Sequence, residues 1–130
     1  MPNDTASFSI KVTGDVTGET WHGSFKTRLR LSHRDQFRQD QIRRELLGGV
    51  NPESASKRAL NAAEVFSVIA IHIFDAPKWW LQADNGLLLE DDNVIAAVYE
   101  EILKAKAEAM SALVKKGEEA KADLKNLEAK

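Results

Sequence analysis

The stretch that decides the fold is Val65–Trp80, VFSVIAIHIFDAPKWW, which is the most apolar segment of the chain. Apolar side chains occupy nearly every face of Val65–Phe74, and this predicts the second half of a helix at the centre of a core. The helix is expected to end near Asp75, because helical backbone is disfavoured just before Pro77. Residues 77–82 are expected to add one further helical turn, which carries a pair of tryptophans.

The composition is that of an ordinary globular domain. The chain has 130 residues, of which 43% are hydrophobic and 29% charged, enough for one moderate core. It has no cysteine, which excludes disulfides, thiolate metal sites and a cysteine nucleophile. The net charge of -2 argues against a general nucleic-acid binder. We expect no signal peptide and no membrane helix, since the longest near-apolar run is far shorter than the roughly 20 residues required.

A β-hairpin is predicted at 8–31, before the apolar stretch. Apolar and polar residues alternate on both sides of a turn at 13–18, TGDVTG, as in two strands that bury one face. The face expected to be exposed is polar and basic, and it carries Arg28 and Arg30. Since an isolated hairpin is only marginally stable, we expect it to pack on the helices or to pair with another chain.

A helical body of about three to four helices is predicted at 33–116. The first helix, about 33–47, should begin at a capping box in which Ser32 and Asp35 exchange hydrogen bonds with each other's backbone. It should end at the glycine pair 48–49, because glycine readily adopts the left-handed backbone that closes a helix.

The second and the last helix have their own start signals. Asn51 and Pro52 are expected to open the second helix, because asparagine is a good N-cap and proline suits the first helical position. The last and longest helix is expected at about 92–116, with an option of running to residue 127. Asp91 or Asp92 is expected to cap it, which explains the local acidic residues better than a calcium loop does.

The predicted fold class is therefore α+β, with an N-terminal β-hairpin followed by a mainly helical body. No linker divides the chain, so residues 1–130 are interpreted as a single domain. Residues 117–130 form a polar C-terminal extension in which only two leucines are apolar. We expect this extension to be a solvated or frayed helix unless a partner receives it.

The sharpest charge asymmetry is the basic stretch from Lys26 to Arg44, which carries a local charge of +5. One interpretation is a docking surface for phosphate or for an acidic protein face. The other is a solvated face, or one matched within the chain by the acidic C-terminal half. The candidate partner-binding arginines are Arg28, Arg30, Arg34, Arg38, Arg43 and Arg44.

The second candidate site is the tryptophan pair, Trp79 and Trp80. Neighbouring residues on a helix point about 100° apart, so the two rings are not expected to enter one core together. Either one ring belongs to the core while the other anchors a partner, or both are buried, one against the hairpin and one against the last helix.

Catalytic and metal-binding patterns are not found. The three histidines, His22, His33 and His72, lack the i, i+4 spacing of helical metal ligands. We interpret His72 as a core histidine with one hydrogen bond. No serine lies in a nucleophile motif, and no glycine-rich phosphate loop is present. The sequence thus predicts a non-enzymatic protein without a cofactor or a metal.

The order of these parts resembles small proteins of tailed-bacteriophage structural modules. The segments that carry the resemblance are GDVTGETWHGSFKTRLRLS, the helix from LSHRDQ, the stop RRELLGG, DAPKWW and the start LEDDNV. Over about residues 8–105 the layout is similar to that of tail assembly chaperones, and also to that of small head-associated proteins that coat or stabilise capsids. No diagnostic motif is shared, so no residue roles are carried over.

This resemblance implies a protein that contacts other virion proteins, in the virion or in the host cytoplasm during assembly. The leading hypothesis is a capsid- or head-associated structural protein, and the alternative is a tail assembly chaperone that holds tail subunits. A nucleic-acid-binding regulator that uses the basic helix is a further alternative. The expected partners are virion or tail proteins, with self-association considered as well; nucleic acid is disfavoured and no membrane is expected.

Overall fold

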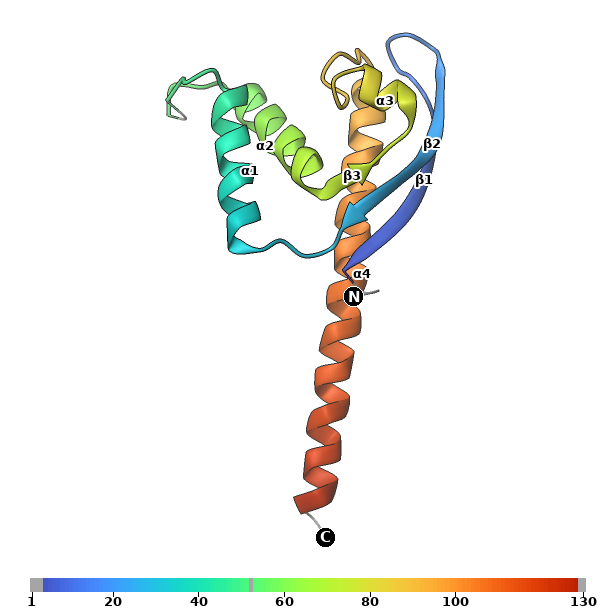
Figure 1. The fold of residues 1–130 in the computed structure, drawn as a ribbon, viewed down its shortest axis with the longest axis vertical. Coiled ribbons are helices and arrows are strands. Elements are labelled where there is room, and N and C mark those ends of the chain that lie inside the picture. Colours follow the sequence, from blue (N-terminus) through green and yellow to red (C-terminus); the bar gives the residue numbers. More distant parts are fainter. Residues whose placement is uncertain (1–3, 52, 129–130) are drawn as a thin grey trace.

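The computed structural model describes residues 4–51 and 53–128, and Figure 1 shows their arrangement. A long vertical helix carries the other elements on its upper part. This confirms the predicted α+β class with an N-terminal hairpin. The elements in chain order are β1 (Thr5–Thr13), β2 (Thr20–Arg28), α1 (His33–Leu46), α2 (Lys57–His72), β3 (Ile73–Asp75), α3 (Lys78–Gln82) and α4 (Asp92–Glu128).

Strands β1 and β2 form the predicted antiparallel hairpin, paired from Thr5↔Arg28 to Thr13↔Thr20. Because side chains alternate across a strand, one face packs on the core and the other meets solvent. Phe8 lies opposite Phe25 on the inner face, and the two rings stack with centroids 5.3 Å apart. The outer face is polar, as the sequence predicted.

A third strand replaces the predicted end of the central helix. Helix α2 stops at His72 rather than near Asp75, and Ile73 adopts an extended conformation. Ile73–Asp75 then forms β3, which pairs antiparallel with β2 and makes the sheet order β1-β2-β3. The correction has a physical reason: the second edge of β2 presents unpaired backbone groups, and the nearby chain satisfies some of them. This pairing joins residues far apart in the chain, so the apolar pattern of Val65–Phe74 could not predict it.

The start of α2 also differs from the prediction. The helix begins at Lys57, and its N-cap is Ser56, whose Oγ accepts a hydrogen bond from the backbone of Ala59 (3.1 Å). Asn51 instead closes a turn, because its side-chain oxygen accepts from the backbone N–H of Glu53 (3.1 Å). The other half of the predicted start signal, Pro52, lies outside the described residues.

The capping box at the start of α1 is confirmed. The Oγ of Ser32 accepts from the backbone of Asp35 (3.1 Å), and the Asp35 carboxylate accepts from the backbone of Ser32 (3.1 Å). These bonds lower the pKa of Asp35. Despite its good start, α1 has no buried residue and lies beside α2 at the rim of the molecule, as Figure 1 shows.

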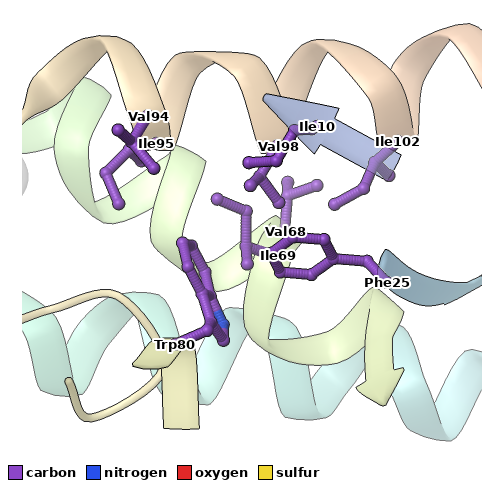
Figure 2. Close-up of a cluster of buried hydrophobic side chains, with 9 residues drawn as sticks. All are labelled: Ile10, Phe25, Val68, Ile69, Trp80, Val94, Ile95, Val98 and Ile102. Carbon is purple, nitrogen blue, oxygen red and sulfur yellow. The ribbon is translucent and has the colours of Figure 1, made fainter. Parts of the chain in front are cut away.

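The core gathers side chains from the hairpin, α2, α3 and the first half of α4, as Figure 2 shows. Ile69, from the stretch on which the prediction centred, is almost wholly buried there. The residues that form the cluster are Ile10, Phe25, Val68, Ile69, Trp80, Val94, Ile95, Val98 and Ile102. The core-facing residues of α4 end near Ile102, so the helix packs with its N-terminal part only.

Asp91 joins the hairpin turn to the start of α4. Its carboxylate is fully buried and accepts hydrogen bonds from the backbone N–H groups of Val16 and Thr17 (both 2.8 Å). It also accepts from the Thr17 hydroxyl (2.6 Å) and from the indole Nε1 of Trp21 (2.9 Å). There is no room for a side chain at Gly14, because a Cβ there would lie 2.1 Å from the carboxylate.

This role corrects the predicted one. The Asp91 carboxylate accepts its hydrogen bonds from the hairpin and not from the first backbone N–H groups of α4. Only the backbone carbonyl of Asp91 accepts from the helix, from the N–H of Val94 (3.1 Å). The hydrogen bonds from Thr17 and Trp21 lower the pKa of Asp91 to about 2, against the opposing effect of burial. The carboxylate is therefore charged wherever the protein is folded near neutral pH.

The lowered pKa of Asp91 predicts an acid-sensitive fold. An unfolded aspartate titrates near pH ~3.9. As the pH falls, the unfolded chain therefore binds a proton at Asp91 at a higher pH than the native chain does. Stability from Asp91 should be complete above pH ~4 and decline as the pH falls toward about 2. Urea unfolding across this range measures the decline. At pH 7, Asp91→Asn should lower the urea midpoint, since its NH2 group would face two of the four donors while its one remaining oxygen can accept only from the other two.

The matched control is Asp92→Asn, at the exposed neighbouring position in the first turn of α4. It removes the same charge but none of the four hydrogen bonds, so we expect a small shift at pH 7 and an unchanged acid profile. Equal shifts for the two variants would contradict the role assigned to Asp91.

Candidate protein-binding surfaces

The tryptophan pair lies between the hairpin and the central helices. Trp80 has no exposed surface, and its ring meets Phe25 edge to face with centroids 5.4 Å apart. Trp79 is half-buried on the hairpin: its ring lies 5.0 Å from that of Trp21, and its Nε1 donates to the carbonyl oxygen of His22 (2.8 Å). Gly23 of the hairpin leaves room for the chain before α3: a Cβ at this position would lie only 2.3 Å from Pro77.

This arrangement assigns both rings to intramolecular packing. Trp80 is inaccessible to a partner in the folded chain, since its exposed fraction is 0%. Trp79 retains some exposed surface, but its indole N–H is already bound to the hairpin. Contrary to the expectation that the two rings would not enter one core together, both pack against Phe25 and against each other, with centroids 6.0 Å apart. Only Trp80 is fully buried, and Trp79 keeps part of its surface exposed.

Arg43 joins α1 to α2, whereas Arg44 forms an ion pair within α1. Arg43 donates to the carboxylates of Asp40 and Glu64, and the second bond, at 2.9 Å, spans the two helices. Arg44 donates to Asp40 as well (2.9 Å). The acidic neighbours raise the pKa of Arg43. These side chains also line a hollow of about 580 Å³ between the helices.

Arg28 and Arg30 also have intramolecular partners. The Arg28 guanidinium donates to the carbonyl oxygen of Ile71 (2.9 Å), which lies in the last turn of α2, and its carbon is 5.8 Å from the centre of the Phe74 ring. This is the usual way in which an arginine satisfies carbonyl groups at a helix end. Arg30 forms an ion pair with Asp4. The basic stretch is thus partly matched by acidic residues and a backbone carbonyl of the N-terminal 75 residues, and none of the ion pairs among the described residues joins it to the acidic C-terminal half.

The remaining two arginines, Arg34 and Arg38, are exposed on α1 and form no ion pair with any residue in the described part of the chain. Between them in sequence lies Phe37, whose exposed fraction of 77% is the highest of any large apolar residue described. Phe37 lies five residues before Ile42, and on a helix this spacing puts the two side chains on different sides.

We name the outward-facing trio Arg34, Phe37 and Arg38 the α1 face. An exposed aromatic ring beside two unpaired guanidinium groups is the combination of residue types found at the energetic centres of protein interfaces. The trio can place a ring in an apolar recess while the cations contact carboxylates around it.

His72 is a second buried polar group that the sequence only partly predicted. It is a core histidine, as expected, but it has two hydrogen-bond partners instead of one. Its Nδ1 lies 2.7 Å from the carbonyl oxygen of Val68, and its Nε2 lies 2.9 Å from the Lys106 ammonium. The first contact requires Nδ1 to carry the proton, so neutral Nε2 accepts from Lys106. Burial, then the charges of Lys106 and Arg28, lower the pKa of His72.

The structure brings together no metal-binding group of His, Asp and Glu among the described residues. His22 and His33 are exposed on different elements and lie apart from His72. Of the helices that the structure describes, none has both the length and the apolar character needed to span a membrane.

Trp80 should contribute to stability far more than its neighbour Leu81. Trp80→Ala removes a fully buried ring and should cost roughly 3–5 kcal/mol of unfolding free energy. Leu81→Ala is the control, because this side chain is largely exposed and its loss should be nearly neutral. Urea unfolding monitored by circular dichroism measures both. A small loss for Trp80→Ala would contradict the packing described.

Protonation of His72 should destabilise the protein. Because its folded pKa is lowered, the native state binds fewer protons than the unfolded state below pH ~6.5. The contribution of His72 to stability should therefore be complete above that pH and decline as the pH falls below it toward 5. Urea midpoints across this range should show the decline in the wild type and in the exposed control His33→Gln. If His72→Gln keeps the same pH dependence, another group is responsible.

Comparison of the chain with protein-family models, with curated proteins and with solved structures finds no match. Of the surfaces described above, the α1 face combines the highest aromatic exposure with two arginines that form no ion pair among the described residues, and it is the strongest candidate for contact with another protein.

Proposed function

We propose that this protein is a non-enzymatic structural component of a bacteriophage virion that binds capsid or other head proteins. The observation that carries the binding role is the α1 face. The bacteriophage setting rests on the order of the elements, which resembles small phage structural proteins. The proposed places of action are the virion and, during assembly, the host cytoplasm.

The α1 face suits a partner that is acidic around an apolar recess. Phe37 would bury most of its 77% exposed surface, and burial of a ring of this size stabilises a contact by roughly 1.5–3 kcal/mol. Arg34 and Arg38 would supply charge-assisted bonds whose strength falls with salt. Since α1 contributes no residue to the core, a partner can occupy its outer face without disturbing the fold.

The sheet offers a second contact of a different kind. Strand β1 lies at the edge of the sheet, and its nine residues have a paired neighbour on one side only within the described structure. An edge strand can accept an additional strand from a partner through backbone hydrogen bonds. The polar outer face of the hairpin, with Lys11 and Lys26 exposed, favours an acidic partner here too.

A tail assembly chaperone is the second candidate. It is favoured by the apolar residues Leu81, Leu87 and Leu88, which are exposed on α3 and the turn after it. A surface of this kind can cover an apolar segment of a tail subunit before assembly. This candidate predicts co-purification with the tail-tube protein from infected cells, together with absence from mature particles.

A nucleic-acid-binding regulator would use the same two unpaired arginines. Phosphate contacts make such binding steeply dependent on salt. Filter binding that shows no retention near physiological salt would remove this candidate.

The virion proposal predicts many copies of the protein in purified particles, measured by quantitative mass spectrometry against the major capsid protein. Arg34→Glu combined with Arg38→Glu should reduce incorporation at least about tenfold, which corresponds to a loss of about 1.4 kcal/mol. Fold stability should not change, because neither side chain has an ion-pair partner among the described residues.

The control is Lys57→Glu combined with Arg58→Glu, the same charge change on exposed residues in the first turn of α2. It should leave incorporation at the wild-type level. Absence of the wild-type protein from particles would contradict the structural role and favour the chaperone. Equal incorporation of both double variants would show that the α1 face is not the contact surface.

A further inference from the structure

The C-terminal half of α4 extends beyond the rest of the molecule, as Figure 1 shows, and we name residues 110–127 the arm. Its side chains are exposed at every position for which burial is described. A helix of this length without tertiary support is only marginally stable in water, and Gly117 in its interior weakens it further. The arm therefore gains from any contact that buries an apolar side.

The arm has one apolar side that follows a regular spacing. Six residues on this side are separated by steps that alternate between three and four residues, as in a heptad repeat, while Ala112, Val114 and Ala122 lie outside this spacing. This spacing lets one side of the arm face a second helix along its length, as in helices that wind around each other with a left-handed twist. The residues of the stripe are Met110, Leu113, Gly117, Ala120, Leu124 and Leu127.

We propose that the occupant of this stripe is a second copy of the chain, with the two arms paired antiparallel. In the proposed register the paired residues are Met110 with the partner's Leu127, Leu113 with the partner's Leu124, and Gly117 with the partner's Ala120, and each pair occurs twice. Large side chains therefore pack against large ones, and small against small. The small residues lie at the two-fold axis, where they let the helices approach closely.

Charge decides between the antiparallel and the parallel arrangement. In the antiparallel register Lys116 flanks the stripe opposite the partner's Asp123, and symmetry repeats this attraction. In a parallel pair Lys116 would lie opposite the partner's Lys121, and this repulsion would occur twice. In the antiparallel pair Lys121 instead lies beside the partner's Val114, whose exposed side chain its aliphatic stem can cover.

The position of the folded body is compatible with this pairing. The body of each copy packs on the N-terminal part of α4, so antiparallel arms place the two bodies at opposite ends. At the base of the arm a groove of about 560 Å³ lies between the hairpin and α4, lined by residues that include Ala6, Leu29, Met110 and Leu113. The partner's Leu127 reaches this groove, since it pairs with Met110. The contact is separate from the α1 face and does not depend on it.

A short interface of this kind predicts a dimer that dissociates on dilution. Sedimentation equilibrium of the full chain, from micromolar to millimolar concentration, should show a monomer–dimer equilibrium. Leu113→Glu combined with Leu124→Glu should weaken association at least about tenfold. The control, Lys115→Glu combined with Ala122→Glu, places two glutamates on the opposite side of the arm and should leave association close to that of the wild type.

The orientation is tested by reversing one flanking charge. Lys116→Glu places a carboxylate opposite the partner's Asp123 and should weaken an antiparallel dimer, whereas it would strengthen a parallel one by facing Lys121. Lys116→Glu combined with Asp123→Lys restores the opposite charges and should recover wild-type association. Circular dichroism should show that the body stays folded in each variant.

Disulfide trapping gives an independent measure, because the chain has no cysteine of its own. A mixture of Gly117→Cys and Ala120→Cys proteins should form the mixed disulfide in preference to either like pair under mild oxidation. A monomer at all concentrations would overturn the proposal. So would preferential pairing of like variants, which would indicate parallel arms.

Discussion

The buried carboxylate of Asp91 is the interaction on which the packing of the hairpin against the helices depends. Four donors from the hairpin, two of them backbone amides of the turn, converge on its two oxygens. A charge without exposed surface is tolerated only because every acceptor site is used. The turn is thereby held at the start of α4, and the inner face of the hairpin, with Phe25, is directed onto the core.

From this anchor the molecule divides into a packed body and two outlying helical parts. The body closes around Trp80 and Ile69, and the indole N–H of the half-buried Trp79 is bound to the hairpin. Helix α1 and the arm of α4 contribute nothing to the buried core cluster. Surfaces that do not support the fold can carry contacts without a loss of stability, and we assign a different proposed partner to each.

Local sequence signals predicted much of the fold. Alternation defined the hairpin, and the exchange between Ser32 and Asp35 marked the start of α1 to the residue. These features depend on residues close in the chain, whose side chains satisfy nearby backbone groups or repeat with the period of one element. Among the candidate site residues, the sequence identified the basic stretch. It could not show that Arg43 forms an ion pair with Glu64, whereas Arg34 forms none among the described residues, because Glu64 lies on another helix.

The sequence by itself determined the α+β class, the hairpin with its buried face and the central apolar helix. Only the tertiary structure decided the end of α2 at His72, the addition of β3 and the use of Asp91 as an anchor for the hairpin. Each of these depends on groups far apart in the chain: the end of α2 and β3 depend on the free edge of β2, and the role of Asp91 depends on the donors near Thr17. A periodic pattern reports which side of an element is apolar, whereas the partner of a polar group is known only when the chain is folded.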